Sequence, residues 1–414
     1  MSTEPREIHH CRMCGSTALE TVIELGNQCL TGIFPRAGAA QPRSAPLRLL
    51  RCDGECGLVQ LAHSGDLAEM YGDNYGYRSG LNPSMVQHLQ DKVRRIQDHQ
   101  ALTPGDAIID IGSNDGTTLN CYPQGIYELV GIDPTGEKFR GYYSPGVKMV
   151  PEFFSAKLAA QTLEGRKAKV VTSFSMFYDL EDPLEFMREV RSILADDGIW
   201  VFEQSYLTAM LETNSFDTIC HEHLEYYGIR QLAWAAERSG LELSEVEFNP
   251  VNGGSCSVTA RPANGKPVHG RTVQMALAEE QRMGLHTPEP FRAFTARVAG
   301  CRAGLLDFIH AASKRGERVA GLGASTKGNV LLQYCGIDDK LLPVIGEVNP
   351  DKFGCVTPGT RIPILPEREV LAGSFDYLLV LPWHFRKFLV GRPHLRGRRL
   401  LMPLPVLEVV VGGA

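Results

Sequence analysis

Four cysteines near the N-terminus have a spacing that suits a metal ion. Cys11 and Cys14 form one close pair, Cys52 and Cys56 form a second, and 37 residues separate the two pairs. Zinc prefers four tetrahedral ligands, and two thiolates on one tight turn can occupy adjacent corners. The pairs therefore predict a structural zinc site that uses all four sulfurs and leaves no open position. Free buried thiols are an alternative, and a CxxC redox pair is less favoured because no thioredoxin-like βαβ pattern surrounds it.

A histidine-rich and acidic segment, residues 216–227, is the main candidate for proton transfer. It contains the run His221-Glu222-His223. Histidine can take a proton near neutral pH, and a neighbouring acid can orient it or bind a substrate hydroxyl. The two histidines stand two positions apart and so do not share a helix face, unlike the ligands of a zinc protease. General acid–base chemistry is thus favoured over a metal site, with a hydrogen-bonded surface loop as the alternative.

Two tyrosine-bearing segments are expected beside this one. Residues 71–79 contain Tyr75 and Tyr77, and residues 175–183, which follow a predicted strand, contain Tyr178. Loops at the carboxyl ends of strands line the ligand crevice of a doubly wound sheet. If a base removes a proton beside a ketone, hydrogen-bond donors such as tyrosine must stabilise the enolate oxygen. The predicted catalytic residues are His223, Glu222, Tyr75, Tyr77, Tyr178 and His221.

A βαβ pattern in the middle of the chain predicts a nucleotide-type cofactor. Residues 107–111 indicate a buried parallel strand, a glycine-rich turn and a helix follow, and residues 129–133 indicate a second strand ending in an acid. The turn has two glycines four positions apart rather than the G-x-G-x-x-G of a pyrophosphate binder. Asp110 and Asp115 would repel a pyrophosphate but suit a sulfonium and its amino group. S-adenosylmethionine (SAM) is therefore favoured over NAD, and the predicted cofactor residues are Asp110, Gly112, Asn114, Asp115, Gly116, Asp133, Phe153 and Ser173.

The C-terminal third contains a second α/β pattern, which follows a helical stretch at about residues 277–314. Residues 317–322 indicate a strand, and the turn that follows places Lys327 among small residues, as in an anion cradle. The turn lacks the Walker A spacing, and an ordinary tight turn with a solvated lysine is the alternative. Further strands are expected at residues 342–346 and 377–381. The predicted substrate-binding residues are Ser325, Lys327, Asn329, Glu347, Trp383 and His384.

Length and composition limit what these elements can build. The chain has 414 residues, enough for two to four domains, and 42 Lys and Arg stand against 48 Asp and Glu. The resulting net charge of −6 argues against a nucleic-acid binder. The sequence has neither an apolar run of membrane-spanning length nor a secretory h-region at its start. We therefore expect a cytoplasmic α/β protein without membrane or nucleic-acid partners.

Several of these motifs together resemble the sugar C-methyltransferases that act on nucleotide-linked keto-deoxyhexoses. The resemblance extends from Cys11 to His384 and is most specific at residues 56–61, 110–116, 222–224, 253–255 and 323–329. It implies a zinc-binding domain (1–72), a class I SAM methyltransferase domain (73–275) and a Rossmann-like substrate domain (276–414). In the family, a histidine that follows a glutamate acts as the base, which corresponds to Glu222-His223. This chain has Cys220 where the family usually has a tyrosine, Tyr178 where a histidine is frequent, and a second cysteine pair one residue wider than usual.

The predicted function follows from the motifs and the resemblance together. We expect a SAM-dependent C-methyltransferase that acts at C3 of a nucleotide-diphosphate 4-keto-6-deoxyhexose, as a monomer or weak homodimer. A SAM-dependent O- or N-methyltransferase of a nucleotide sugar is the nearest alternative. A non-catalytic SAM- or nucleotide-binding protein is an alternative from a different class.

Overall fold

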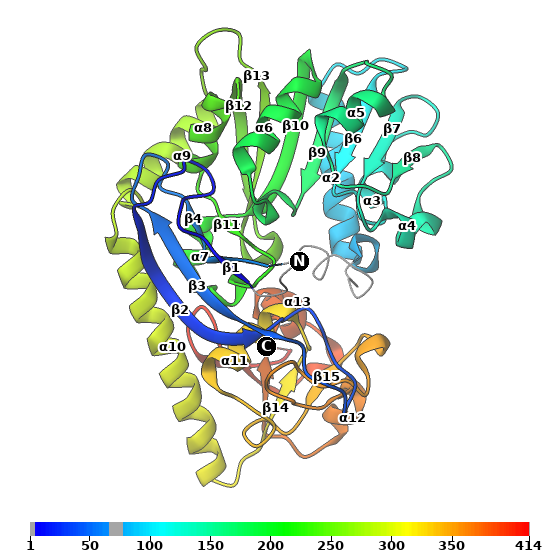
Figure 1. Ribbon diagram of the computed structural model, residues 1–414. Coiled ribbons are helices and arrows are strands. Elements are labelled where there is room, and N and C mark those ends of the chain that lie inside the picture. The colour runs from blue at the N-terminus through cyan, green and yellow to red at the C-terminus, as the bar shows by residue number, and fades with distance from the viewer. Residues whose placement is uncertain (1–4, 66–77, 414) are drawn as a thin grey trace.

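The computed structural model describes residues 5–65 and 78–413. Tyr75, Tyr77 and the domain boundary expected at residue 72 lie outside this part of the chain. The described residues form an N-terminal sheet module, a middle α/β unit and a C-terminal α/β unit (Figure 1). The mixed α/β fold expected from the sequence is confirmed.

The N-terminal module contains a four-stranded sheet that a segment of the middle unit completes, and a separate two-stranded sheet formed by its first and fifth strands. Its strands are β1 (Arg6–Glu7), β2 (Leu19–Cys29), β3 (Ser44–Cys52), β4 (Val59–Leu61) and β5 (His63–Ser64). Alternate residues of β3, such as Leu47 and Leu49, are buried, as expected for a strand with one face on a core. The sheet order is β11-β4-β3-β2, and β11 (Glu225–Tyr226) comes directly after the predicted catalytic run. The long β2–β3 hairpin also reaches the C-terminal unit, where β2 packs against α10 and α11 (Figure 1).

The middle unit contains a twisted sheet in the order β12-β13-β10-β9-β6-β7-β8. The strands β10, β9, β6, β7 and β8 run parallel, and β13 is antiparallel to both of its neighbours. Every residue of β6 is buried, which suits a parallel strand covered on both faces. The strands are β6 (Ala107–Ile111), β7 (Glu128–Ile132), β8 (Val147–Val150), β9 (Ala168–Phe174), β10 (Leu194–Ser205), β12 (Leu241–Asn249) and β13 (Ser255–Pro262). The helices of this unit are α2 (Pro83–His99), α3 (Thr117–Asn120), α4 (Gly136–Phe139), α5 (Ala156–Thr162), α6 (Pro183–Ile193), α7 (Leu207–Glu212) and α8 (Ile229–Arg238).

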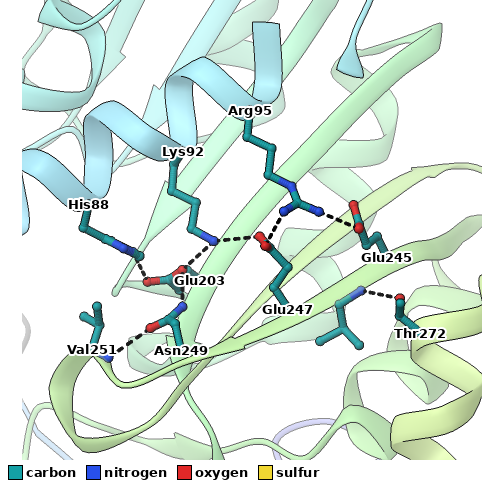
Figure 2. Close-up of polar contacts among 10 residues, drawn as sticks. His88, Lys92, Arg95, Glu203, Glu245, Glu247, Asn249, Val251 and Thr272 are labelled. Carbon is teal, nitrogen blue, oxygen red and sulfur yellow. Dashed lines mark hydrogen bonds and ion pairs between the residues drawn. The ribbon is translucent and has the colours of Figure 1, made fainter. Parts of the chain in front are cut away.

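Helix α2 is fastened to this sheet by a network of charged side chains (Figure 2). The carboxylate of Glu203, on β10, lies 2.6 Å from Nε2 of His88 and 3.1 Å from Nζ of Lys92, and it accepts a hydrogen bond from Asn249. Burial alone opposes ionisation of Glu203, but the hydrogen bond from His88 and the charge of Lys92 outweigh it and leave the pKa of this carboxyl below its usual value. The network fixes the helix that follows the tyrosine-bearing segment 71–79.

The C-terminal unit has its own sheet, in the order β16-β15-β14-β17-β18-β19. Its strands are β14 (Val319–Leu322), β15 (Ile345–Glu347), β16 (Ile364–Pro366), β17 (Tyr377–Val380), β18 (Arg399–Met402) and β19 (Glu408–Val411), and its helices are α11 (Thr326–Cys335), α12 (Glu367–Ala372) and α13 (Arg386–Val390). The helical stretch expected at 277–314 is in fact two helices, α9 (Arg271–Arg282) and α10 (Glu289–Lys314). Gly284 and Pro288 lie in the break, and neither favours a continuous helix. Helix α9 crosses the boundary expected at residue 275 and packs against β12 and α8 of the middle unit.

The remaining strand predictions agree with the structure to within a few residues. The predicted strand at 107–111 has the observed bounds, whereas β7 is shifted by one residue from the predicted 129–133 and β14 begins after the predicted residue 317. Within the described residues, no helix is long and apolar enough to cross a membrane.

Candidate active site

The four N-terminal cysteines come together as predicted. Their sulfur atoms all lie within 4.8 Å of one another, with 3.5 Å between Cys11 and Cys56 and between Cys14 and Cys52. Tetrahedral zinc with Zn–S bonds of about 2.3 Å would place the sulfurs about 3.8 Å apart, so the cluster fits the ion. Gly57 follows the last cysteine with a φ of +67°, and a Cβ there would meet the Arg230 side chain at 2.8 Å.

Crowding makes these thiols resist losing all four protons together. Hydrogen bonds from Cys52 and Cys56 lower the pKa of Cys11 below its usual value. Donation of its own proton to Cys11 raises the pKa of Cys52 above its usual value. Four thiolates so close together need a divalent cation, which is the charge that zinc supplies.

The glycine-rich turn after β6 forms one side of the cofactor site. Asp133, at the end of β7, accepts hydrogen bonds from the backbone N–H of Asn114 (2.8 Å) and of Thr135 (2.6 Å), and also from the Thr135 hydroxyl. A carboxylate offers about four acceptor positions, so one remains on Asp133 for a ribose hydroxyl. Gly116 has a φ of +74°, and a Cβ there would meet the Tyr143 ring at 2.7 Å. The residues at this turn fit the adenosine side of SAM.

The other predicted cofactor residues differ in their burial and in their hydrogen-bond partners. Asp110 is buried and accepts a hydrogen bond from Thr172 (2.6 Å), and burial raises the pKa of its carboxyl to about 7. Asp115 faces the start of the α2 region, where it accepts from the backbone N–H of Gly80 and lies 3.5 Å from Nε of Arg78. The remaining residues are Gly112, which begins the turn, Phe153, which is exposed after β8, and Ser173, which is fully buried and accepts a hydrogen bond from the Trp200 indole.

His223 is partly buried and lies among other polar side chains. Its Nδ1 lies 3.1 Å from the carbonyl oxygen of Thr218, and its ring centroid lies 4.3 Å from that of Tyr178. Burial and the nearby Lys327 charge lower the pKa of His223 to about 4, although the Thr218 contact opposes this. The imidazole is therefore neutral at physiological pH.

The two residues before His223 point in different directions. The Glu222 carboxylate lies beside the N-terminal module, where a Cβ on Gly32 would be 3.0 Å from its Oε1. Its Oε2 is buried and has no hydrogen-bond partner within residues 5–65 and 78–413. His221 instead directs Nε2 at the carbonyl oxygen of Ala45 on β3, 3.2 Å away. The structure thus brings Tyr178 to His223 and turns His221 toward the N-terminal sheet.

Three of the predicted substrate-binding residues, Lys327, Trp383 and His384, lie in the same polar cluster as His223. Nζ of Lys327 donates to the carbonyl oxygen of Asn252 (2.6 Å), and its charge acts on both His223 and His384. Trp383 donates from its indole to Asp217 (2.8 Å), whose second oxygen has no hydrogen-bond partner in the described part of the chain. Burial and the charge of Lys327 lower the pKa of His384 to about 3. The two α/β units therefore share one polar cluster.

Ser325, Asn329 and Glu347 have partners within the protein. Ser325 caps α11 by accepting from the backbone N–H of Gly328 (3.0 Å), and Asn329 donates to the carbonyl oxygen of Thr31 (2.7 Å). Glu347 accepts from the backbone N–H of Ala324 (2.7 Å) and from those of the two residues that follow it. These contacts hold the turn after β14, so a role in substrate binding stays a prediction for all three.

Sequence reasoning missed two residues of this cluster. Asp217 lies inside the segment singled out for its histidines, but its position beside Lys327 and Trp383 depends on the packing of the C-terminal unit. The backbone carbonyl of Asn252 anchors Lys327, and a backbone group gives no sequence signal. The glycines at 253 and 254 are the one local indication that the chain approaches another segment closely there.

The sheet order, the turn after β6 and the cysteine cluster define a class I SAM-dependent methyltransferase with an N-terminal zinc-binding module. Family comparisons match a zinc binding domain at residues 11–71, a methyltransferase domain at 85–246 and the C-methyltransferase C-terminal domain at 250–405. C-methyltransferase NovU of Streptomyces niveus is 30% identical over 412 residues, which cover 98% of this chain and 97% of that protein. The chain belongs to this C-methyltransferase family.

Two solved structures with partial similarity are described as methyltransferases. The CcbJ methyltransferase from Streptomyces caelestis has a TM-score of 0.34 and 15% identity, covering 48% of this chain and 96% of that one. The CurJ carbon methyltransferase has a TM-score of 0.34 and 13% identity, covering 45% of this chain and 57% of that one.

Proposed function

We propose that this C-methyltransferase acts on a nucleotide-diphosphate 4-keto-6-deoxyhexose and methylates C3, in the biosynthesis of a branched deoxysugar. His223 is the base, Glu222 orients the sugar, and Lys327 with His384 and Trp383 holds the substrate from the C-terminal side. The main observation in support of this proposal is the hydrogen bond between Nδ1 of His223 and the carbonyl oxygen of Thr218.

That hydrogen bond fixes which nitrogen can accept a proton. A carbonyl oxygen can only accept, so Nδ1 of His223 must donate to Thr218. The neutral ring then has its lone pair on Nε2, which is the form a base needs. Nε2 would take the proton from C3, the carbon beside the 4-keto group, and the electrons of that C–H bond would form the enolate.

The charges around His223 suit this reaction. An enolate places negative charge on the ketone oxygen, and preorganised cationic or donor groups stabilise such charge. The partly buried ammonium of Lys327 lies close enough to lower the pKa of His223, and the Tyr178 ring lies against the histidine. The unpartnered oxygen of Glu222 can accept a hydrogen bond from a sugar hydroxyl.

The cofactor supplies an electrophilic methyl group on a sulfonium. Asp133 would accept from its ribose, and the backbone of the turn from Gly112 to Gly116 would lie against it. Asp110 and Asp115 place acidic groups at the same strand end, as expected beside a cation.

The test is methyl transfer with a panel of nucleotide-diphosphate 4-keto-6-deoxyhexoses, followed by mass spectrometry. We expect a mass increase of one methylene and, with substrate deuterated at C3, loss of that deuterium. His223→Gln should lower the rate by about a hundredfold or more, in the range of lost acid–base catalysis, while leaving SAM binding unchanged. His394→Gln is the matched control, because His394 pairs with Glu367 on the C-terminal unit.

Two outcomes would overturn the proposal. Methylation with full retention of deuterium at C3 would exclude the C3 enolate and favour transfer to oxygen or nitrogen. Transfer to none of the nucleotide sugars would remove the substrate class. The location and assembly that we propose, a cytoplasmic monomer or weak homodimer, are tested separately by fractionation and sedimentation.

A further inference from the structure

Arg12 stands between two zinc ligands and reaches away from the metal. Its side chain is only 3% exposed. Nη1 donates to the carbonyl oxygen of Leu61 (2.6 Å), and Nη2 donates to the hydroxyl of Ser64 (2.9 Å). The backbone N–H of Arg12 also donates to Gln60 Oε1 (3.0 Å). The cysteine turn is thereby tied to β4 and β5.

The remaining edge of the same guanidinium faces two carboxylates of the middle unit. Nε of Arg12 lies 3.5 Å from Glu181 and 3.8 Å from Glu225. The Glu225 side chain is fully buried. Burial raises the pKa of Glu225 well above its usual value, and the charge of Arg12 opposes that rise.

These two carboxylates belong to the segments that hold the candidate catalytic rings. Glu181 follows the short helix η3 (Phe177–Asp179), which carries Tyr178, and Glu225 begins β11, two residues after His223. The rings of Tyr178 and His223 lie 4.3 Å apart. One guanidinium thus contacts both segments whose rings meet in the site.

The backbone reinforces the link between the metal module and His223. The N–H of Leu61 donates to the carbonyl oxygen of Leu224 (2.8 Å), and Gln60 pairs with Glu225 across β4 and β11. The residue after His223 is therefore bound to β4, the same strand to which Arg12 donates hydrogen bonds.

We propose that Arg12 is a positioning residue that connects the zinc-binding turn to the two segments carrying Tyr178 and His223. Zinc fixes the turn, the turn fixes the guanidinium, and the guanidinium holds the two segments in register. The zinc site would then support the reaction at His223 only by fixing the positions of these segments, without contacting the substrate. The catalytic part of this inference rests on the proposed function of His223, whereas the ordering of the two segments does not.

The test compares Arg12→Met with Arg12→Lys and with a control, Arg48→Met. Arg48 lies on β3 of the same module and pairs with Glu7 and Glu24, so it does not reach the middle unit. For each holoprotein we would measure zinc content, hydrogen–deuterium exchange in peptides covering 177–182 and 222–227, and kcat and KM.

Arg12→Met should keep one zinc per chain, speed exchange in both peptides by about tenfold, and lower kcat by about tenfold or more. KM for SAM should stay within twofold. Arg12→Lys should recover part of both effects, because lysine supplies the charge without the planar fork. Arg48→Met should match the wild type.

The inference is overturned if Arg12→Met keeps zinc and shows wild-type exchange and kcat. It is also overturned if Arg12→Met loses zinc, because Arg12 would then serve the metal turn itself. A wild type that methylates no nucleotide sugar would refute the proposed function, while the exchange measurements would still decide the role of Arg12.

Discussion

The neutral state of His223 can be measured without any substrate. A pKa of about 4 means that at pH 5.5 about one ring in thirty carries a proton, whereas an ordinary histidine with a pKa of 6.5 would be about nine-tenths protonated. Labelling histidine at ¹³Cε1 and recording NMR spectra from pH 7.5 to 5.0 would follow each ring. The signal that disappears in His223→Gln should not titrate over this range.

The causes of the lowered pKa predict how a variant changes it. Burial is the larger cause, and the charge of Lys327 is the second. Lys327→Met removes the charge while keeping a long side chain, so the pKa of His223 should rise but stay below 6.5. The pKa of His384 should rise in the same variant, because Lys327 acts on it as well. Lys352→Met is the control, since Nζ of this second buried lysine donates to Ala324 and the charge does not act on His223.

The pH range of this titration follows from the effect that protonation of His223 has on the stability of the fold. A histidine whose pKa is lowered by folding contributes stability above its unfolded pKa of 6.5, and that stability is lost as the pH falls toward 4. The titration therefore stops at pH 5.0, where most of the folded protein should remain. A wild-type His223 that titrates at pH 6 or above would refute the argument. So would a Lys327→Met spectrum identical to that of the wild type.

Two further predictions concern the parts that hold the site. Glu203→Ala leaves Lys92 and His88 without their shared carboxylate, and it should lower the free energy of unfolding in urea by about 3 kcal/mol. The exposed Glu245→Ala should cost about 1 kcal/mol or less, and equal losses would contradict the buried network. Because the pKa of Glu203 is lowered, its contribution is present at neutral pH and is lost as the pH falls below its usual value. Removal of zinc by a chelator should abolish exchange protection in β3 and β4 while β6 stays protected, and unchanged protection in β3 would show that the metal does not hold the module.

The sequence predicts those parts of the site that local chemistry determines. Three of these parts are short-range patterns, each compatible with one local structure: the cysteine pairs, the turn after β6 and the acid at the end of β7. The strands at 107–111 and 129–133 were predictable because most of their residues are apolar, as a sheet covered on both faces requires. The break between α9 and α10 was not predicted, although Gly284 and Pro288 within it are local signals against a continuous helix.

The other features of the site depend on contacts between segments that are far apart in the sequence, and no local pattern predicts such contacts. The segment after His223 supplies a strand to the N-terminal sheet, although a two-residue strand such as Glu225–Tyr226 has no recognisable periodicity. His221 and His223 are alike in sequence, yet one bonds to Ala45 and the other to Thr218. The packing of this turn against the N-terminal sheet, where His221 meets Ala45, leaves His223 to enter the polar cluster.

The hydrogen bonds of the C-terminal unit change the interpretation of its glycine-rich turn. In the middle unit Asp133 holds the turn by accepting from Asn114, and in the C-terminal unit Glu347 accepts from Ala324 in the same way. The two turns are thus built alike, but Lys327 leaves the second one to reach Asn252 of the middle unit. A lysine held there contributes its charge to the cluster around His223 instead of to an isolated anion cradle. The C-terminal unit therefore forms one wall of the candidate active site, and the middle unit alone would lack the cation that helps to keep its histidine neutral.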